Sequence, residues 1–570
     1  MASEQDSYDY VIVGAGISGV VVASRLHEGI PSASILLIET GKDESEFDFS
    51  KYAKHISSVR GSRIDYSYDT VPQKHLDGKS KKAWAGCALS GGGAINVGAW
   101  MRGPAVDYDR WAALAGDKSW TFENLLPYFR KSETFRSNGS MPVDTKLHGT
   151  DGPMEIKMMR EVRNGKAYPL GDLMRTAWEE LEPSISWNAD YNNGLPLGMS
   201  DLATTFVRAE RQNPHLAFNL SGVNLLTENQ VHRVLLQKDE GVKEPRAVGV
   251  ELVGGRKIAA RTSVIVCAGV FNSPKLLLLS GIGGAAHLQQ NDIPVQVDLP
   301  AVGRGFRDDL TIRQVWRLRH PERGLSFGSP LLTDPDLIEH VPVDFFVWRQ
   351  APVNLIREAL TKDDLSSAEV EKHPLLHPLA VHEEMYTMWM AGRSAALLAQ
   401  LGLSNDGSLV CTSTYIMSPT SEGTITLASA DPLAPPVIDP NYYATETDRA
   451  IYRDALRKHM RVLLDTPSGK SAIAAEVPPA GFPALGPTSS DADLDRRIGA
   501  FAETGSHPNG SCAMGKVVDS HLRVCGVAGL RVIDASIFPA PIATHIQAVV
   551  YAVAEKGAAL LVEDMKHTDS

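Results

Sequence analysis

Two histidines near the C-terminal end of the chain could carry out proton-transfer chemistry. His507 lies in GSHPNGSCAMG and His545 in APIATHIQAVVYAVAEKGA, 38 residues further on. The first stretch, with its proline and glycines, is typical of an irregular loop, whereas the second leads into an apolar helical pattern. An imidazole has an unperturbed pKa of about 6.5, which suits a general base near neutral pH. A single histidine is more often structural, so the rest of the chain must indicate whether the two share a site.

The first element that could position such chemistry is a dinucleotide-binding segment at the N-terminal end. Residues 10–13 (YVIV) predict a buried strand, GAGISG follows at 14–19, and an apolar helix follows that. Gly14 permits the tight turn, Gly16 lets the backbone approach a pyrophosphate, and Gly19 lets the helix pack closely on the strand. The helix N-terminus then faces the phosphates. The candidate cofactor-binding residues here are Gly14, Gly16, Ser18 and Gly19.

A second predicted strand, residues 34–38 (SILLI), ends at Glu39, twenty residues after Gly19. An acid at this place hydrogen-bonds the ribose hydroxyls of an adenosine, and it favours FAD or NAD over NADP. FAD and NAD place their ADP halves in the same way, so this segment does not separate them. A lone GxGxxG pattern is weak evidence, but the strand, helix, second strand and Glu39 together predict a dinucleotide site.

Length and composition limit the class of protein. The chain has 570 residues, more than the roughly 250 to 300 at which one hydrophobic core stops growing, so two or more domains are expected. Its net charge of -12 argues against a nucleic-acid partner, which clustered Lys and Arg normally bind. The five cysteines are scattered without CxxC spacing, as in a reducing compartment. No secretion signal and no membrane span are visible, so we expect a cytoplasmic protein.

A second glycine-rich segment lies between residues 81 and 109, KKAWAGCALSGGGAINVGAWMRGPAVDYD. Its core, Ser90 to Gly93, has almost no side chains. Successive small residues expose amide N–H groups and clear space for a flat ring or a pyrophosphate. The flanking apolar residues Trp84, Leu89 and Ile95 argue against a flexible surface loop. We therefore predict that the cofactor contacts Gly92, Gly93, Asn96 and Val97.

This segment and a later one resemble a known family. Residues 86–103 match in Gly86-Cys87-x-Leu89, the small-residue quartet, Ile95-Asn96, Trp100 and Gly103, and residues 269–283 match in GxxxSPxLLxxSGIG. These stretches resemble the two signatures of the glucose-methanol-choline oxidoreductase family, and weaker similarity extends over nearly the whole chain. Ser90 departs from the pattern, because the family usually has a glycine there. In the second segment we expect a helix that begins at Ser273-Pro274, with a proline in its first turn.

The resemblance implies the cofactor and further contacts. Members of the family use FAD, and some attach it covalently through a histidine in the first signature loop. No histidine lies between His75 and His148, so we expect noncovalent FAD. By the same resemblance, Val231 presents its backbone to the adenine and Ile546 and Gln547 line the pyrimidine side of the flavin. Asp534 and Ala535 lie near the phosphate and ribityl end; the alternative for Asp534 is a simple strand-end cap.

The resemblance also gives the two histidines one site. His507 matches the family's His-x-x-Gly-Ser/Thr-Cys/Ala-x-Met motif, and His545 matches the histidine ahead of the last helix. Oxidation of an alcohol removes the hydroxyl proton and transfers a hydride from the same carbon to flavin N5. His507 is the expected base, and His545 is expected to orient the alcohol or alkoxide. The substrate would be a small-molecule alcohol, such as an aryl alcohol or a secondary metabolite, with oxygen or another electron acceptor reoxidising the flavin.

Other readings stay open at this point. A non-redox flavoprotein, like the hydroxynitrile lyases that resemble this family, would use the same acid and base groups, and a binding protein is a third reading. No metal site is expected, because His373, His377 and His382 lie among prolines without HExxH spacing. No GxSxG nucleophile elbow occurs, and Ser506 is better explained as a pocket wall. Trp348, Met388, Trp389 and Met390 could line a substrate pocket but are equally good core residues.

The cofactor motifs lie at both ends and in the middle of the chain, so only the fold can bring them together. We expect an α/β protein with a Rossmann-like FAD-binding domain and an α+β substrate-binding domain built on an antiparallel sheet. The first domain is assigned residues 1–155, 222–310 and 500–570, and the second residues 156–221 and 311–499. Strands are predicted at 343–348 and 409–417 in the second domain. The oligomeric state and the identity of the alcohol are left open.

Overall fold

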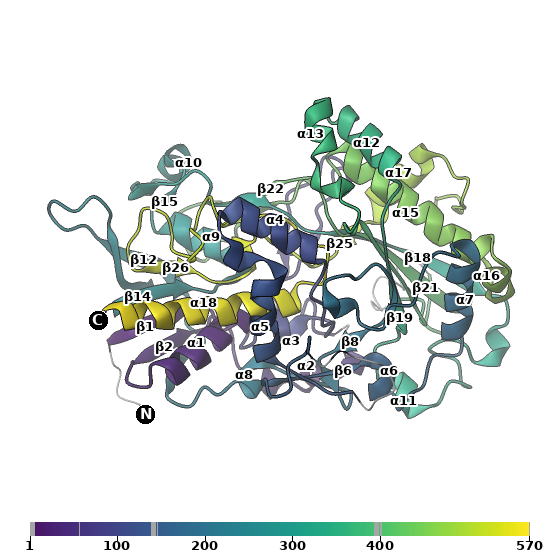
Figure 1. Cartoon of the computed structure of the whole chain (residues 1–570), viewed down its shortest axis with the longest axis horizontal. Helices are drawn as coiled ribbons and strands as arrows, with labels where there is room; N and C mark the ends of the chain where they lie inside the picture. Colours follow the sequence, from purple (N-terminus) through teal and green to yellow (C-terminus); the bar gives the residue numbers. More distant parts are fainter. Residues whose placement is uncertain are drawn as a thin grey trace.

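The computed structural model describes residues 6–55, 58–137, 144, 146–392, 398 and 402–568. Two large sheets organise the chain, one in each half of the molecule (Figure 1). The first sheet contains mainly parallel strands, and the second is antiparallel. The α/β fold class with an antiparallel second sheet is therefore confirmed.

The first sheet has the strand order β11-β2-β1-β14-β13-β12, and β26 also pairs with β14. The strands are β1 (Ser7–Val13), β2 (Ile35–Ile38), β11 (Val223–Leu226), β12 (Val231–Gln237), β13 (Arg246–Leu252), β14 (Lys257–Val266) and β26 (Leu530–Val532). Strands β11, β2, β1, β14 and β26 are parallel. Strand β2 and the C-terminal ends of β1 and β14 are continuous buried apolar runs, as expected of strands covered on both faces.

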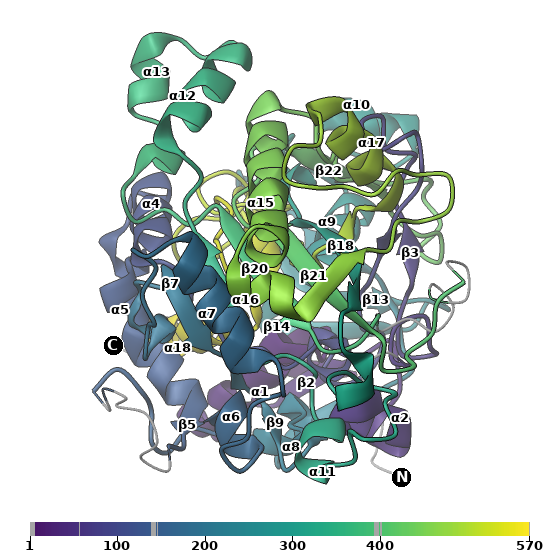
Figure 2. The same cartoon turned by 90° about the vertical axis from the view of Figure 1, so that its right-hand side faces the viewer.

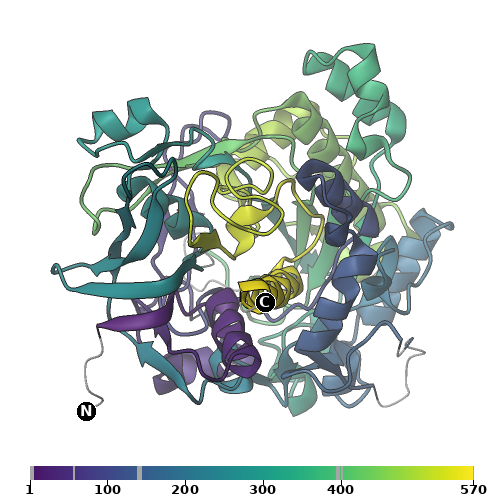
Figure 3. The ribbon, with the colours of Figure 1, turned by 60° about the vertical axis from the view of Figure 1, so that its left-hand side comes forward.

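Two helices from opposite ends of the chain pack together on this sheet. Helix α1 (Ile17–Gly29) follows β1 directly, and α18 (Gln547–Thr568) lies beside it (Figure 3). Residues 548–554 of α18 are all buried. This all-round burial requires an apolar sequence without polar breaks, which AVVYAVA supplies. The C-terminal segment is therefore part of the dinucleotide-binding layer.

The second sheet has the strand order β24-β18-β21-β20-β19-β7, and β25 pairs with β18. Its strands are β7 (Gly198–Asp201), β18 (Leu310–Leu318), β19 (Phe345–Arg349), β20 (Glu383–Met388), β21 (Leu409–Ile416), β24 (Ile473–Glu476) and β25 (Glu503–Thr504). Helix α15 (Glu446–Leu464) packs on β20 and β21, and it contacts α7 (Gly171–Leu181) and α16 (Pro467–Ala472) (Figure 2). Every residue of β21 is buried; α15 packs against this strand, and its Tyr415 lines the cavity between the two sheets.

The structure corrects one predicted helix boundary. Helix α9 spans Gly269–Leu279, so Pro274 lies inside it rather than in its first turn. A proline has no N–H for the carbonyl four residues earlier, here that of Val270. Ser511 Oγ donates to this carbonyl at 2.6 Å. The helix can therefore begin before the proline, because a residue far along the chain replaces the missing hydrogen bond.

The strands of the two sheets alternate along the chain. Those of the first sheet lie within residues 7–38, 223–266 and 530–532, and those of the second within 198–201 and 310–504. The domain boundaries drawn from the sequence remain a prediction, and β25 near one of them pairs with the second sheet. In the described part of the chain, no helix is both long and apolar enough to cross a membrane.

Candidate active site

A cavity of about 390 Å³ lies between the two sheets. It begins at the carboxyl ends of β1 and β2, where Gly14 and Glu39 line it, and it reaches strands β18 to β21 of the second sheet. His507 and His545 line this second end. In an open sheet with parallel strands, ligands bind outside the carboxyl ends of the strands, so the cavity lies where the fold predicts a dinucleotide.

The turn between β1 and α1 has the geometry that a diphosphate needs. Gly14 has φ 99°, and a Cβ there would lie 2.5 Å from the carbonyl oxygen of Cys267. A Cβ on Gly19 would lie 1.8 Å from the carbonyl oxygen of Gly14. Helix α1 has no side-chain cap and no acid in its first turn, and the buried Ser18 hydroxyl has no hydrogen-bond partner among the described residues. These donors at the cavity wall fit an anion.

Glu39 lies at the end of β2, as the sequence predicts, and it lines the cavity. Its Oε2 accepts from the Ala15 backbone N–H at 2.9 Å, and its Oε1 accepts from the Gly41 N–H at 2.8 Å. Burial raises the pKa of Glu39 to about 7, against the lowering effect of these two hydrogen bonds. Each carboxylate oxygen keeps a lone pair that can accept from a ribose hydroxyl.

The small-residue loop contacts the β1–α1 turn. A Cβ on Gly91 would lie 2.9 Å from Gly16 Cα, whereas a Cβ on Gly92, which lines the cavity, would have nothing within 4 Å. Ser90 has φ 67°, a left-handed conformation that a glycine adopts without strain. The loop therefore adopts a left-handed backbone at a serine, at a strain of about 1 kcal/mol. Gly93 packs against Pro214 behind the loop.

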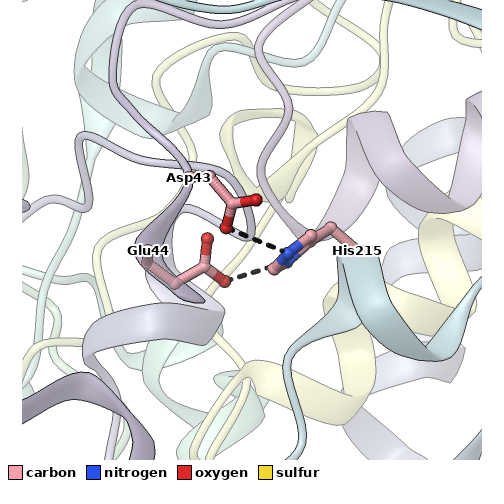
Figure 4. A group of neighbouring side chains, drawn as sticks. All are labelled: Asp43, Glu44 and His215. Carbon is pink, nitrogen blue, oxygen red and sulfur yellow. Dashed lines mark ion pairs between the residues drawn. The ribbon is translucent and has the colours of Figure 1, made fainter. Parts of the chain in front are cut away.

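A partly buried group of ion pairs, made by Asp43, Glu44 and His215, contacts the loop through Ser90 (Figure 4 shows the three side chains). Ser90 Oγ lies 2.9 Å from His215 Nδ1. His215 Nδ1 also lies 3.0 Å from Glu44 Oε1, and His215 Nε2 lies 3.3 Å from Asp43 Oδ1. Burial lowers the pKa of His215, but the two carboxylates outweigh it and the net pKa is raised. The three side chains are close enough to ligate a metal ion. Because each ring nitrogen already faces an acid, we interpret the group as an ion-pair anchor.

The other predicted cofactor residues line the same cavity: Asn96, Val97, Val231, Asp534, Ala535, Ile546 and Gln547. Asn96 Nδ2 donates to Gln547 Oε1, which joins the small-residue loop to the start of α18. Asp534 accepts from Gly269 N–H at 2.9 Å, from Ser273 Oγ at 2.5 Å and from Ser536 N–H at 2.8 Å. Asp534 therefore caps two elements and also borders the cavity, so the two readings of this residue are compatible.

His507 and His545 approach one another from different elements. His507 follows β25 in an irregular loop, and His545 lies two residues before α18. Their ring centroids are 4.3 Å apart, and both residues are 6% exposed. The fold thus brings together the two histidines that the sequence singled out.

Each imidazole is held by a buried carboxylate that sequence reasoning missed. His507 Nδ1 lies 2.9 Å from Asp309 Oδ2, next to the start of β18. His545 Nε2 lies 2.8 Å from Glu384 Oε1 on β20. Within the described residues, no hydrogen bond engages the second nitrogen of either ring, so Nε2 of His507 and Nδ1 of His545 are left for a ligand. Adjacent acids inside apolar strand sequence, as in HEEMYTM, were the available signal, because buried acids require partners.

Burial and the neighbouring basic side chains favour the neutral form of His507. Burial, together with His545 and Arg60, lowers the pKa of His507 well below its usual value. Burial, Asp308 and Glu384 raise the pKa of Asp309 well above its usual value. The adjacent Asp308 accepts from the His507 backbone N–H at 2.8 Å and from Thr504 Oγ at 2.5 Å.

Aromatic side chains of the second sheet cover the histidines. Tyr415 lies 6.2 Å from His507 and 5.9 Å from His545 between ring centroids, and Phe346 lies 5.6 Å from His545. Tyr386 hydrogen-bonds Tyr415 through the two hydroxyls at 3.2 Å. The residues suggested for this role by sequence do not line the cavity: Trp348, Met388, Trp389 and Met390. Trp348 instead donates its indole N–H to Glu384 Oε2 at 2.8 Å.

The fold and the site define a dinucleotide-binding protein with a buried pair of histidines in the cavity between its two sheets. The family profile described as GMC oxidoreductase matches residues 8–311 and 419–554. The chain therefore belongs to the GMC oxidoreductase family, a family of FAD-dependent flavoproteins. This confirms the resemblance seen in the two signature segments.

Relatives and solved structures agree with this assignment. The chain is 36% identical to the GMC-type oxidoreductase acuG of Aspergillus aculeatus, over 97% of this chain and 99% of that protein. It is 32% identical to oxygen-dependent choline dehydrogenase 1 of Chromohalobacter salexigens, over 96% of this chain and 94% of that protein. It resembles the structure of a formate oxidase from Aspergillus oryzae RIB40 with a TM-score of 0.83 and 25% identity, covering 99% and 100% of the two chains. A fungal aryl-alcohol oxidase structure matches in fold with a TM-score of 0.79 and 22% identity, with coverage of 99% and 100%.

Proposed function

We propose that the protein oxidises the CH–OH group of a small-molecule alcohol with noncovalently bound FAD, in the cytoplasm. The observation that carries this proposal is the pair of imidazoles whose ring centroids are 4.3 Å apart, at one end of the cavity that begins at the glycine-rich turn. Each ring has one nitrogen without a hydrogen-bond partner among the described residues. Both rings are fixed by buried acids, so they are preorganised for one substrate oxygen.

The cavity walls fit FAD. The first turn of α1 with the unpartnered Ser18 hydroxyl would hold the diphosphate, and Glu39 would hold the adenosine ribose. The open Gly92 and the Asn96–Gln547 pair border the space for a flat ring. When bound, FAD supplies the acceptor for the hydride that leaves the carbinol carbon. The only histidines among the described residues that line the cavity are the paired ones, which supports noncovalent attachment.

His507 is the proposed base. Its Nδ1 lies 2.9 Å from Asp309 Oδ2; in the proposed role the ring carries its hydrogen on Nδ1, and the lone pair of Nε2 accepts the hydroxyl proton. Burial keeps the ring neutral before reaction. A positioned general base contributes about 10²- to 10⁴-fold to such a step. His545, held through Nε2 by Glu384, presents Nδ1 to the same oxygen and orients it.

The aromatic wall sets the substrate class in this proposal. Phe346, Tyr386 and Tyr415 pack around the histidines and exclude water from the reacting oxygen. An apolar or aryl alcohol, primary or secondary, matches this surface better than a polyol would. Oxygen or another small acceptor would then reoxidise the cofactor.

Anaerobic spectroscopy of the FAD-loaded protein tests the proposal. Benzylic, allylic, aliphatic and polyhydroxy alcohols are mixed with the protein, and flavin absorbance is followed before oxygen is admitted. Bleaching by an apolar alcohol is expected, followed by oxygen consumption if the enzyme is an oxidase. A protein that stays yellow with every alcohol but cleaves cyanohydrins would instead be a non-redox lyase. Release of FAD by acid precipitation would confirm noncovalent attachment, whereas a yellow pellet would contradict it.

A further inference from the structure

We infer that Asp309 is a positioning residue that fixes the tautomer of His507, so that Nε2 rather than Nδ1 meets the alcohol, and that the two side chains titrate as one unit. This inference rests on the proposed role of His507 as the base. It adds a residue that lies outside both signature segments and does not line the cavity.

The geometry leaves the His507 ring little freedom. Asp309 Oδ2 lies 2.9 Å from His507 Nδ1, and the two side chains are only 3% and 8% exposed. The Gly505 N–H donates to the Asp309 carbonyl at 2.6 Å, and the His507 N–H donates to Asp308 Oδ1 at 2.8 Å. A Cβ on Gly505 would lie 2.8 Å from Asp309 Cβ, so a glycine is needed for this close approach. Two further hydrogen bonds, from Gly505 N–H and from His507 N–H, therefore attach the His507 loop to the residues just before β18.

The two acids of the site hold opposite nitrogens of the two rings. Asp309 lies within hydrogen-bond distance of Nδ1 of His507, whereas Glu384 lies within hydrogen-bond distance of Nε2 of His545. Glu384 also accepts from the Trp348 indole and so cannot move to serve His507 without losing that bond. Asp309 is thus the only acid within hydrogen-bond distance of the His507 ring among the described residues. Because Asp309 contacts Nδ1, the nitrogen of the proposed base that remains to accept the hydroxyl proton is Nε2.

Proton counting shows what this pairing does to the pH dependence. Two protons can be placed on the pair in two ways. Either the protonated carboxyl group of Asp309 donates to Nδ1 and the other hydrogen is on Nε2, or Asp309 is a carboxylate and both ring nitrogens carry hydrogen. In neither form does Nε2 have a free lone pair. Loss of one proton gives a carboxylate that accepts from Nδ1–H, and Nε2 becomes basic. The rate should therefore rise with pH through a titration that belongs to the pair. The charged or titratable groups that face it from the surrounding elements are Asp308, Glu384, His545, Tyr415, Tyr442 and Arg60.

The negative charge of Asp309 favours the imidazolium form, so it holds this titration at a higher pH than a lone buried imidazole would have. Burial alone lowers the pKa of His507. Replacement of Asp309 by Asn removes the charge and one titrating proton. The acid limb of the pH profile should then move to lower pH, and the maximal rate should fall because the amide can also donate to Nδ1 and select the wrong tautomer.

The test is the rate constant of anaerobic flavin reduction, measured across pH in FAD-loaded protein with a substrate found in the alcohol panel. Asp309→Asn is expected to lower the plateau about 10- to 100-fold and to move the acid limb to lower pH. Asp309→Glu, which keeps the carboxylate, is expected to keep the limb near its wild-type position. Asp201→Asn serves as the matched control, because Asp201 is a similarly buried acid (2% exposed) that bonds backbone N–H groups and no histidine.

An unchanged plateau and acid limb in Asp309→Asn would overturn the inference, as would a limb that moves equally in Asp201→Asn. If Asp309→Asn does not fold, ¹⁵N-histidine spectra of the wild type decide instead, with His507→Ala for assignment. A neutral ring that carries its proton on Nδ1 supports the inference, and one that carries it on Nε2 contradicts it. Normal reduction in His507→Ala would contradict the role of His507 as the base, whereas a wild-type flavin that no alcohol reduces would contradict the proposed function.

Discussion

The carboxylate of Glu384, on the second sheet, holds the imidazole of His545: Glu384 Oε1 lies 2.8 Å from His545 Nε2. The other carboxylate oxygen, Oε2, accepts from the indole N–H of Trp348. Glu384 is fully buried on the second sheet, and His545 enters from the helix that completes the first. The orientation of one imidazole is therefore set across the interface between the sheets.

Substitution of Glu384 by Gln should weaken this orientation without removing it. Glutamine keeps an acceptor for one of the two donors but loses the charge-assisted bond, which is worth about 1.5–3 kcal/mol. We expect the rate constant of flavin reduction to fall about tenfold or more, with FAD still bound and with the acid limb of the pH profile near its wild-type position. A large shift of that limb would show that Glu384, rather than Asp309, determines the pH at which the base loses its proton.

Substitution of His507 by Ala should remove the base. Flavin reduction by the best alcohol is expected to slow by about 10²- to 10⁴-fold, while the visible spectrum of bound FAD persists. His545→Ala is the matched variant: it should slow reduction as well, but the remaining rate should keep the pH dependence of the Asp309–His507 pair. Equal, pH-independent losses in both variants would mean that neither ring acts alone as the base.

Glu39 gives a pH-dependent stability to the FAD-free protein. Its folded pKa of about 7 lies above the value of 4.5 expected for an ordinary glutamate. A raised pKa means that its contribution to stability is present below about pH 4.5 and is lost as pH rises through about 7. Thermal unfolding of the FAD-free protein should therefore show a smaller loss of stability between pH 5 and 8 in Glu39→Gln than in wild type. Identical pH slopes would contradict the buried, protonated state.

Ser90 combines a strained backbone with a side-chain bond to His215. Ser90→Ala keeps the left-handed strain and loses the hydrogen bond, so it should destabilise the protein by about 1–2 kcal/mol. Ser90→Gly loses the same bond but relieves the strain, and its free energy of unfolding should stay within about 1 kcal/mol of wild type. Denaturant unfolding of the two variants side by side measures the difference. If alanine proved as stable as glycine, the left-handed conformation would be wrong.

The Ser511–Val270 bond predicts a compensating pair of substitutions. Ser511→Ala leaves the buried Val270 carbonyl without its donor and should cost about 1–3 kcal/mol. Pro274→Ala restores an N–H that can donate to the same carbonyl within α9, so the double variant should recover much of this loss. Additive losses in the double-mutant cycle would show that the serine does not replace the helix bond.

Much of the fold could be predicted because its signals are local. The glycines at 14, 16 and 19 lie in the turn that they make possible, so their spacing predicts it, and Glu39 directly follows its strand. The two histidines were found through motifs. Their acids were not, because Asp309 is 198 residues from His507 and Glu384 is 161 residues from His545. The predicted start of α9 was wrong for the same reason. The donor that permits Pro274 inside the helix is Ser511 Oγ, which is 241 residues away from Val270 in the sequence.

Strand β26 and helix α18 complete a layer that begins with β1 and α1. On the ribosome, residues 7–29 emerge long before residues 530–568 exist. At about 5–20 residues per second, synthesis of the intervening chain takes roughly half a minute to two minutes. Throughout that interval the apolar side of α1 lacks its final cover, which only α18 supplies. Premature termination anywhere before that helix would release a chain whose nucleotide-binding layer has no closing element, whatever the integrity of its first half.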